Sequence, residues 1–371
     1  MMITGAELFV KALKAEQVDT LFAYPGGQAI DLFNALYGEQ DIDVILPRHE
    51  QGLVHAADGY ARSTGKVGVC LVTSGPGATN LVTGIATANY DSVPLVCFTG
   101  QVPTGLIGND AFQEVDIVGI TRSICKYAVT VRKREELAAV IRKAFLISRT
   151  GKPGVVVVDL PKDIQREYGS DDYPEEIEIR GYKPKLSVHP GQLKKALETL
   201  NHAKKPVFLV GGGVNISHAH SEMLKLAEMT GVPVVTTIMG KGAIPTTHDL
   251  YIGNLGIHGS YAANTAISHC DVLFSIGTRF NDRITGKTGH FATHAAIIHI
   301  DIDPASISRN IEVDIPIVAD AKTALLALLE KAQKLDTEEW LEQIRQWKSQ
   351  YPLSMKTEGL TPEKVIRAIN H

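Results

Sequence analysis

A single acidic residue, Glu50, stands where an apolar run ends and a helical pattern begins. The run "DVILP" (43–47) has the composition of a buried strand, and an amphipathic helix is expected from residue 50 onward. A carboxylate at such a junction has two interpretations. It stabilises a helix N-terminus through the helix dipole, or it exchanges a proton with a bound ligand.

Three glycine-rich turns occupy the same kind of position, after a strand and before a helix. They are "YPGGQAI" (24–30), "TSGPGATN" (73–80) and "VGGGVN" (210–215). In open α/β sheets, ligands bind at the carboxyl ends of the strands, where backbone N–H groups are available and glycine permits close approach. Tight βα turns also use glycine for structural reasons alone, so each turn keeps both interpretations. Together with Glu50, the three turns favour a ligand site.

The elements that position these residues form two alternating series of strands and helices. In the first series, we expect strands at 20–26, 43–47, 67–77, 94–100 and 153–161, and helices at 5–17, 28–38, 50–64, 78–90 and 134–149. In the second, we expect strands at 206–213, 232–237, 271–279, 295–303 and 315–320, and helices at 191–202, 217–230, 260–269 and 321–334. Apolar strands that alternate with helices predict parallel sheets covered on both faces. The fold class is therefore α/β, with two doubly wound parallel-sheet domains.

The predicted domains span residues 1–165 and 191–335. The segment 166–190 is rich in charge, proline and glycine, and is expected to be a linker. Residues 336–371 are expected to form a connector helix, "TEEWLEQIRQWKSQ", and the beginning of a further domain. The second expectation rests on "LTPEKVIRAINH", where Thr361 and Pro362 give a helix-start signal with no strand after it. We therefore expect a third domain to be missing.

Composition and charge narrow the class of protein. Of the 371 residues, 44% are hydrophobic and 21% charged, which is typical of a globular protein. The formal net charge of −4 offers no electrostatic reason to expect nucleic acid or a membrane surface as partner. The four cysteines have no C-x-x-C spacing and are expected to be structural. These features predict a cytoplasmic location.

Several motifs resemble those of thiamine-diphosphate-dependent enzymes and, among them, the acetolactate synthase family. They are "PGG" (25–27), "RHEQGLVHAADGYARSTG" (48–65), "TSGPGATN" (73–80), "DAFQE" (110–114), "LPKD" (160–163), "LGIHG" (255–259), "GTRFNDR" (277–283) and "HIDIDP" (299–304). The resemblance implies a flavodoxin-like pyrimidine-binding domain followed by a Rossmann-like central domain that binds FAD. The family's third, pyrophosphate-binding domain carries a Gly-Asp-Gly…Asn signature, and no "GDG" occurs in this sequence.

The resemblance also implies an activity. Members of this family condense two molecules of pyruvate, or pyruvate and 2-oxobutyrate, with loss of CO2, in isoleucine and valine biosynthesis. It implies thiamine diphosphate, Mg²⁺ and FAD as cofactors, a homodimer, and a small regulatory subunit as a further partner. The FAD has no net redox role in this carboligation. A pyruvate oxidase-like enzyme is the alternative, and the 371-residue chain alone is expected to be an inactive binding scaffold.

Finally, the resemblance implies residue roles. In this family the carboxyl at the Glu50 position hydrogen-bonds N1′ of the aminopyrimidine ring and so promotes loss of the C2 proton. The catalytic candidates are Gly27, Glu50, Gln113 and Lys162, with Phe112 beside the substrate. The thiamine diphosphate candidates are Tyr24, Pro25, Glu50, Thr73, Pro76, Asn80 and Gln113. The FAD candidates are Lys152, Gly211, Gly212, Gly213, Thr237, Leu255, Gly256, His258, Gly277, Arg279, Asn281, Arg283, Asp301, Ile302 and Asp320.

Two of these FAD candidates depart from the family pattern. Lys152 stands where the family usually has arginine, and Asn281 where it usually has aspartate. Lysine keeps the positive charge of arginine but loses its bidentate hydrogen bonding. No metal ligand is expected in this chain, because the family's Mg²⁺ site belongs to the third domain.

Overall fold

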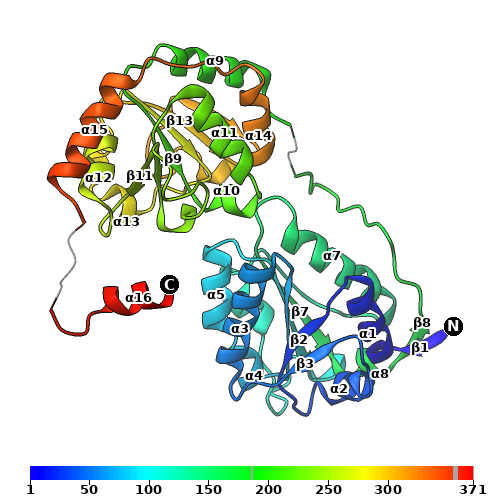
Figure 1. The fold of residues 1–371 in the computed structure, drawn as a ribbon. Helices are drawn as coiled ribbons and strands as arrows, with labels where there is room; N and C mark the ends of the chain where they lie inside the picture. The colour runs from blue at the N-terminus through cyan, green and yellow to red at the C-terminus, as the bar shows by residue number, and fades with distance from the viewer. Residues whose placement is uncertain (185–186, 354–357, 371) are drawn as a thin grey trace. The chain divides into compact units, whose positions relative to one another are not determined.

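The computed structural model describes residues 1–184, 187–353 and 358–370 (Figure 1). The chain forms two compact units, Met1–Pro184 and Lys185–His371, and each has its own sheet and core. The prediction of two α/β domains is confirmed. None of the helices in the described ranges is long and apolar enough to cross a membrane.

The first unit is built on a six-stranded parallel sheet. Its strands are β2 (Thr20–Ala23), β3 (Asp43–Ile45), β4 (Gly68–Val72), β5 (Leu95–Gln101), β6 (Tyr127–Thr130) and β7 (Val155–Pro161). The strand order is β3-β2-β4-β5-β7-β6, so the chain reverses its direction of travel across the sheet between β2 and β4. This reversal is the switch point of a flavodoxin-like sheet, where ligands characteristically bind. Strand β6 is a partly buried edge strand that the sequence pattern did not predict.

Helices cover both faces of this sheet, as Figure 1 shows. Those of the first unit are α1 (Gly5–Ala15), α2 (Ile30–Leu36), α3 (Glu50–Thr64), α4 (Pro76–Thr79), α5 (Val82–Tyr90), α6 (Ile117–Thr121), α7 (Leu137–Arg149) and α8 (Lys162–Arg166). On one face, Phe9 of α1 and Phe145 of α7 enclose Phe98 of β5 in a buried aromatic cluster. On the other face, α3 packs over β4 and β5, and α5 packs against α3 and β7. The helix expected at 78–90 is divided into α4 and α5.

A two-stranded antiparallel ribbon adds to the first unit. Strand β1 (Met2–Thr4) pairs with β8 (Tyr168–Ser170), which lies inside the segment expected to be a linker. Arg134 is only 2% exposed, and its guanidinium donates to backbone carbonyl groups on both sides of this ribbon. Further along, the Tyr173 hydroxyl donates to the buried carboxylate of Glu16 at 2.8 Å. The first part of the expected linker therefore packs against the first unit.

The second unit contains another six-stranded parallel sheet. Its strands are β9 (Pro206–Val210), β10 (Val234–Thr236), β11 (Tyr251–Asn254), β12 (Val272–Ile276), β13 (Ala296–Asp301) and β14 (Ile315–Val318). The order β11-β10-β9-β12-β13-β14 is that of a Rossmann sheet, with its switch point between β9 and β12. Strand β11, which ends in a Gly-Asn pair, was not predicted from the sequence.

Helices again lie on both faces. Those of the second unit are α9 (Pro190–Asn201), α10 (Gly212–Ile216), α11 (His220–Thr230), α12 (Tyr261–His269), α13 (Asp282–Thr285), α14 (Ala321–Leu329), α15 (Glu338–Gln350) and α16 (Pro362–Asn370). The sequence placed α15 in a connector, but its apolar side is part of the second core. Trp340 and Ile344 are buried, and the Trp340 indole donates to the Pro206 carbonyl at 3.1 Å.

Candidate cofactor-binding and active site

The residues predicted to carry the chemistry gather at the carboxyl edge of the first sheet. The turn after β2 carries Tyr24 to Gly27, the turn after β3 leads to Glu50, and the turn after β4 begins at Thr73. All three strands are parallel neighbours, so their carboxyl ends lie at the same edge. This edge is the β2/β4 switch point.

The carboxylate of Glu50 faces the turn after β4 and is not used to cap its own helix. Glu50 is the first residue of α3, and His49 performs the capping, because its Nδ1 accepts from the Gln51 N–H at 3.1 Å. The Asn80 amide donates to Glu50 Oε2 at 3.0 Å. Within the described ranges of the chain, no group donates to the other oxygen, Oε1. One oxygen is thus held in place while the other is available.

Glycine at position 77 keeps the space beside that available oxygen open. A Cβ atom added to Gly77 would lie 3.5 Å from Glu50 Oε1 and 2.9 Å from Thr73 Cγ2. A side chain larger than a methyl group would therefore fill the volume in front of the carboxylate. The absence of a side chain here suits a site that must admit a ligand.

The first two glycine-rich turns contact each other through Thr73. The Gln28 N–H donates to Thr73 Oγ1 at 3.2 Å, and a Cβ atom on Gly26 would lie 2.5 Å from Thr73 Cβ. Glycine at position 26 is thus required by the packing of the two turns. This packing alone explains the glycine at position 26. The contact also fixes Tyr24, Pro25 and Gly27 relative to Thr73.

Gln113 lies over the turn after β4, although it comes from a distant segment. Gly75 has a φ of +56°, and a Cβ atom there would lie 2.6 Å from the Gln113 carbonyl oxygen. Gln113 itself has a φ of +59°, a conformation that costs free energy for a residue with a side chain. Its neighbour Phe112 is 83% exposed. The backbone around Gln113 is therefore shaped by its contact with the glycine turn.

Lys162 contacts the turn after β2. It begins α8 directly after β7, and its ammonium donates to the Gly27 carbonyl at 2.6 Å. The four catalytic candidates thus lie at one edge of the sheet in the first unit. Three separate contacts involve them. These are Glu50 with Asn80, Gln113 with Gly75, and Lys162 with Gly27.

Two further polar side chains at this edge were not predicted from the sequence. Ser74 is 1% exposed, and its hydroxyl has no hydrogen-bond partner in the described part of the chain; the same holds for the buried Gln28 side-chain oxygen. Buried polar groups are normally paired, so unpaired ones next to a glycine turn indicate a place where a ligand or water completes the hydrogen bonding. An available carboxylate oxygen and unpaired polar atoms fit a ring with donor and acceptor nitrogens, such as the thiamine aminopyrimidine.

The second unit presents the expected FAD residues at the carboxyl edge of its own sheet. Each of the six strands is followed by at least one candidate or ends in one, with Gly211 after β9 and Gly277 after β12 flanking the switch point. Lys152 is the exception, since it precedes β7 in the first unit.

Close packing accounts for several of the glycines expected near the flavin pyrophosphate. A Cβ atom on Gly211 would lie 2.2 Å from the Gly277 carbonyl oxygen, and one on Gly213 would lie 2.7 Å from Gly277 Cα. A Cβ atom on Gly212 would meet that of Met239 at 3.1 Å. These glycines allow the turns after β9 and β12 to touch, which by itself explains their presence.

Several other FAD candidates have structural roles. Asp320 caps α14 by accepting from the Thr323 N–H at 3.1 Å, and its second oxygen accepts from Ser217 at 2.7 Å. Thr237 accepts from the Gly240 N–H at 3.1 Å, and Asp301 from the Asp303 N–H at 2.8 Å.

The loop after β11 is joined to the segment after β12. Gly256 has a φ of +104°, and the Ile257 N–H donates to the Arg283 carbonyl at 3.1 Å. The remaining candidates lie around this contact or at the neighbouring strand ends, with various exposures. They are Leu255 (buried), Arg279 and Ile302 (partly buried), and His258, Asn281 and Arg283 (exposed).

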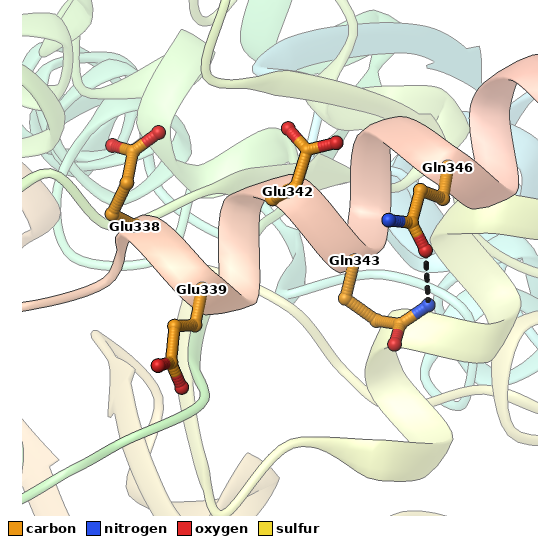
Figure 2. Close-up of a pocket in the computed structure, with 5 residues that line it drawn as sticks. All are labelled: Glu338, Glu339, Glu342, Gln343 and Gln346. Carbon is orange, nitrogen blue, oxygen red and sulfur yellow. Dashed lines mark hydrogen bonds between the residues drawn. The ribbon is translucent and has the colours of Figure 1, made fainter.

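A surface hollow lies on α15 of the second unit. It is lined by Glu338, Glu339, Glu342, Gln343 and Gln346, which all project from this one helix, as Figure 2 shows. Arg345 forms ion pairs with Glu338 at 3.0 Å and Glu342 at 3.2 Å. Because these are exposed side chains of one helix, we assign no site there. No cluster of three or more potential metal ligands occurs among the residues that the structure describes.

Comparison with known proteins covers both units. Residues 3–120 match the thiamine pyrophosphate enzyme N-terminal TPP binding domain, and residues 193–328 match the central domain of the same enzymes. The chain is 53% identical over 350 residues to a probable acetolactate synthase large subunit of Methanocaldococcus jannaschii, covering 93% of this chain and 59% of that protein. It is 47% identical over 379 residues to the acetolactate synthase isozyme 3 large subunit of Escherichia coli, covering 99% and 66%. The chain therefore spans roughly three fifths to two thirds of the length of these relatives.

Proposed function

The chain belongs to the thiamine pyrophosphate enzyme family, and we propose that it forms the pyrimidine-binding and central domains of an acetolactate synthase large subunit. The proposed reaction joins two molecules of pyruvate, or pyruvate and 2-oxobutyrate, with loss of CO2. The observation that carries the proposal is Glu50, whose carboxylate is held by Asn80 on one oxygen and available on the other.

In the proposed mechanism, Glu50 would contact the aminopyrimidine ring of thiamine diphosphate and would give or take a proton at its Oε1. Thiamine diphosphate, when bound, supplies a nucleophilic carbon and an electron sink for the decarboxylation of pyruvate. Asn80 keeps the carboxylate in one orientation, and Gly77 leaves the volume in front of it open. Thr73 joins the turns after β2 and β4, so that Tyr24, Pro25 and Pro76 are held around the same place.

We assign the substrate side to Lys162, Gly27, Gln113 and Phe112. The Lys162 ammonium is oriented by the Gly27 carbonyl, and a fixed cation can bind the carboxylate of a 2-keto acid. Exposed Phe112 offers an apolar surface for the methyl or ethyl group of the substrate. This arrangement fits both pyruvate and 2-oxobutyrate.

For FAD we propose the carboxyl edge of the second sheet, near the β9/β12 switch point. Arg279 supplies positive charge for the pyrophosphate, and the candidates after β11 and β13 complete the site. In this proposal the flavin takes no net redox part, so its reduction by pyruvate would favour the oxidase-like alternative. Arg279→Ala should weaken FAD binding about ten- to a hundred-fold in a flavin fluorescence titration. Lys334→Ala, on the exposed surface beyond α14, is the matched control.

Mg²⁺, a homodimer and a small regulatory subunit belong to the same proposal. The relatives are longer than this chain, and for them we propose a Mg²⁺ site in the region that this chain does not cover. The isolated 371-residue chain is expected to form no acetolactate.

The test is acetolactate formation from pyruvate with thiamine diphosphate, Mg²⁺ and FAD. It is made with this chain extended by the C-terminal region of the Escherichia coli relative. Glu50→Gln should lower kcat by about 10²- to 10⁴-fold, the range that general acid–base catalysis supplies. Glu198→Gln, an exposed glutamate on α9, is the control and should leave the rate unchanged. A Glu50→Gln enzyme that keeps most of its activity refutes the assignment.

A further inference from the structure

A loop that carries two of the proposed active-site residues is closed at its neck by one side chain. Residues 102–115 leave β5 and return to the start of α6, and they include Phe112 and Gln113. At the neck, Gln101 Oε1 accepts from the Val102 N–H at 2.9 Å, and Gln101 Nε2 donates to the Val115 carbonyl at 3.0 Å. The Gln101 amide therefore joins the first and the last residue of the 102–115 loop.

Asp159 fixes the orientation of that amide. Its Oδ2 accepts the second Gln101 Nε2 hydrogen at 3.1 Å. A carboxylate cannot donate, so it selects the amide orientation in which nitrogen faces both Asp159 and Val115. With the amide reversed, its oxygen would face the carboxylate and the carbonyl, and both contacts would be repulsive.

The carboxylate itself is deeply buried and fully hydrogen-bonded. Asp159 is 2% exposed and lies on β7, the strand next to the edge strand β6, between its strand partners Thr99 of β5 and Thr130 of β6. Thr99 donates to Oδ1 at 2.7 Å and Thr130 to Oδ2 at 3.2 Å. The donors on the two neighbouring strands hold the carboxylate in the position from which it accepts from Gln101.

The loop has other anchors, which lie away from the neck. The Thr104 N–H donates to Asp163 Oδ1 at 3.1 Å, and the Gly108 N–H donates to Glu114 Oε1 at 2.6 Å. These contacts brace the loop but do not join its two ends. The neck depends on Gln101.

We propose that Asp159 is a positioning residue which, through Gln101, keeps the neck of the 102–115 loop closed and so holds Gln113 against the Gly75 turn. Only one part of this proposal rests on the proposed function, namely the role of the 102–115 loop in the active site. Its structural content, a closed neck that depends on Asp159, can be tested without any turnover.

The charge state of Asp159 gives the proposal a pH dependence. Burial raises the pKa of Asp159 to about 6, against the opposing effect of its three side-chain donors and of Arg132. Arg132 is the charged group that lowers this pKa. On the elements packed against β7, Cys97 of β5 pairs with Val157, and Asp116 caps α6 at Gly119. Below about pH 6 the charge-assisted bond to Gln101 becomes a neutral one of roughly half the strength. The neck should then open more often.

The experiment is hydrogen exchange, read by mass spectrometry, on peptides from the 102–115 loop of the 371-residue chain. Three variants are compared with the native sequence. Gln101→Met removes both neck bonds, Asp159→Asn removes the charge, and Thr130→Val removes a donor to Asp159 without touching Gln101.

We expect loop exchange at about pH 7.5 to be at least about ten-fold faster in Gln101→Met and three- to ten-fold faster in Asp159→Asn, with Thr130→Val unchanged. In the native chain, exchange corrected for its intrinsic rate should rise as the pH falls through about 6, and Asp159→Asn should abolish this rise.

Unaltered loop exchange in Gln101→Met or in Asp159→Asn overturns the proposal. An equal effect of Thr130→Val also overturns it, because the change would then be a general loosening of the sheet. If Asp159→Asn does not fold, the pH series of the native chain decides. A failure here leaves the Glu50 assignment intact, and a failure of Glu50→Gln leaves this result intact.

Discussion

Asp159→Asn should change the way in which the stability of the first unit depends on pH. The folded unit favours the neutral acid, because burial raises the pKa of Asp159 from its ordinary value of 3.8 to about 6. The stabilising contribution of Asp159 is therefore fully present below about pH 4 and is lost as the pH rises through about 6. The direction is opposite to that of a salt-bridged carboxylate.

The magnitude follows from the same two values. A rise from 3.8 to about 6 corresponds to about 3 kcal/mol of unfolding free energy over the whole titration. About half of this falls between about pH 5 and about pH 8. The native chain should therefore lose on the order of 1–2 kcal/mol relative to Asp159→Asn over this interval, while other titrating groups cancel in the comparison.

The assay is hydrogen exchange, which gives the free energy of opening for the slowest-exchanging amides in β5 and β7. Both tryptophans of the chain, Trp340 and Trp347, lie in α15 of the second unit. Tryptophan fluorescence during urea unfolding therefore reports on the second unit and should not respond to the substitution. A difference between native chain and variant that stays constant with pH, within a few tenths of a kcal/mol, would falsify the reasoning about burial. The core of the first unit should thus weaken with rising pH while the 102–115 loop becomes better protected.

Three further predictions concern single contacts. Glu16→Gln should destabilise the first unit by about 2–4 kcal/mol in the same exchange assay, because the fully buried Glu16 carboxylate pairs with Arg142 at 2.6 Å and Arg149 at 2.9 Å; an unchanged unit would show that these pairs contribute nothing. Gly75→Ala should speed exchange in the 102–115 loop and cost at least ~1 kcal/mol, since φ is +56° and the new Cβ would lie 2.6 Å from the Gln113 carbonyl. Gly105→Ala, with no atom within 4 Å of the new Cβ, is its matched control and should have no such effect. Trp340→Phe should lower the urea midpoint of the second unit, at a cost of about 1–2 kcal/mol for the lost bond to Pro206 and the lost packing; an unchanged midpoint would mean that α15 is not part of that core.

Local sequence signals were sufficient for most of the fold. The run "VVVVDLP" is buried along its whole length, and such a strand can be recognised because a covered parallel sheet requires apolar residues on both faces. Helix α3 has the predicted bounds, 50–64, because a strand end precedes it and Gly65 ends it in a left-handed conformation. The elements that were missed are short or lie at edges. Strand β6 is only partly buried, and β1 and β8 have three residues each, so none of them carries a strong periodic pattern.

For the site, the sequence by itself determined which residues stand at the ends of strands. Glu50, the glycine turns and Lys162 could be located in this way, because a parallel sheet brings all its carboxyl strand ends to one edge. Only the tertiary structure decided which of these residues touch. The contact of Asn80 with Glu50 spans 30 residues, and that of Lys162 with the Gly27 carbonyl spans 135. Asp159 shows the limit most clearly, since within an apolar run it has no distinguishing spacing. Its role depends on strand register, which sets Thr99 and Thr130 beside it and brings Gln101 within reach, and register is a property of the assembled sheet.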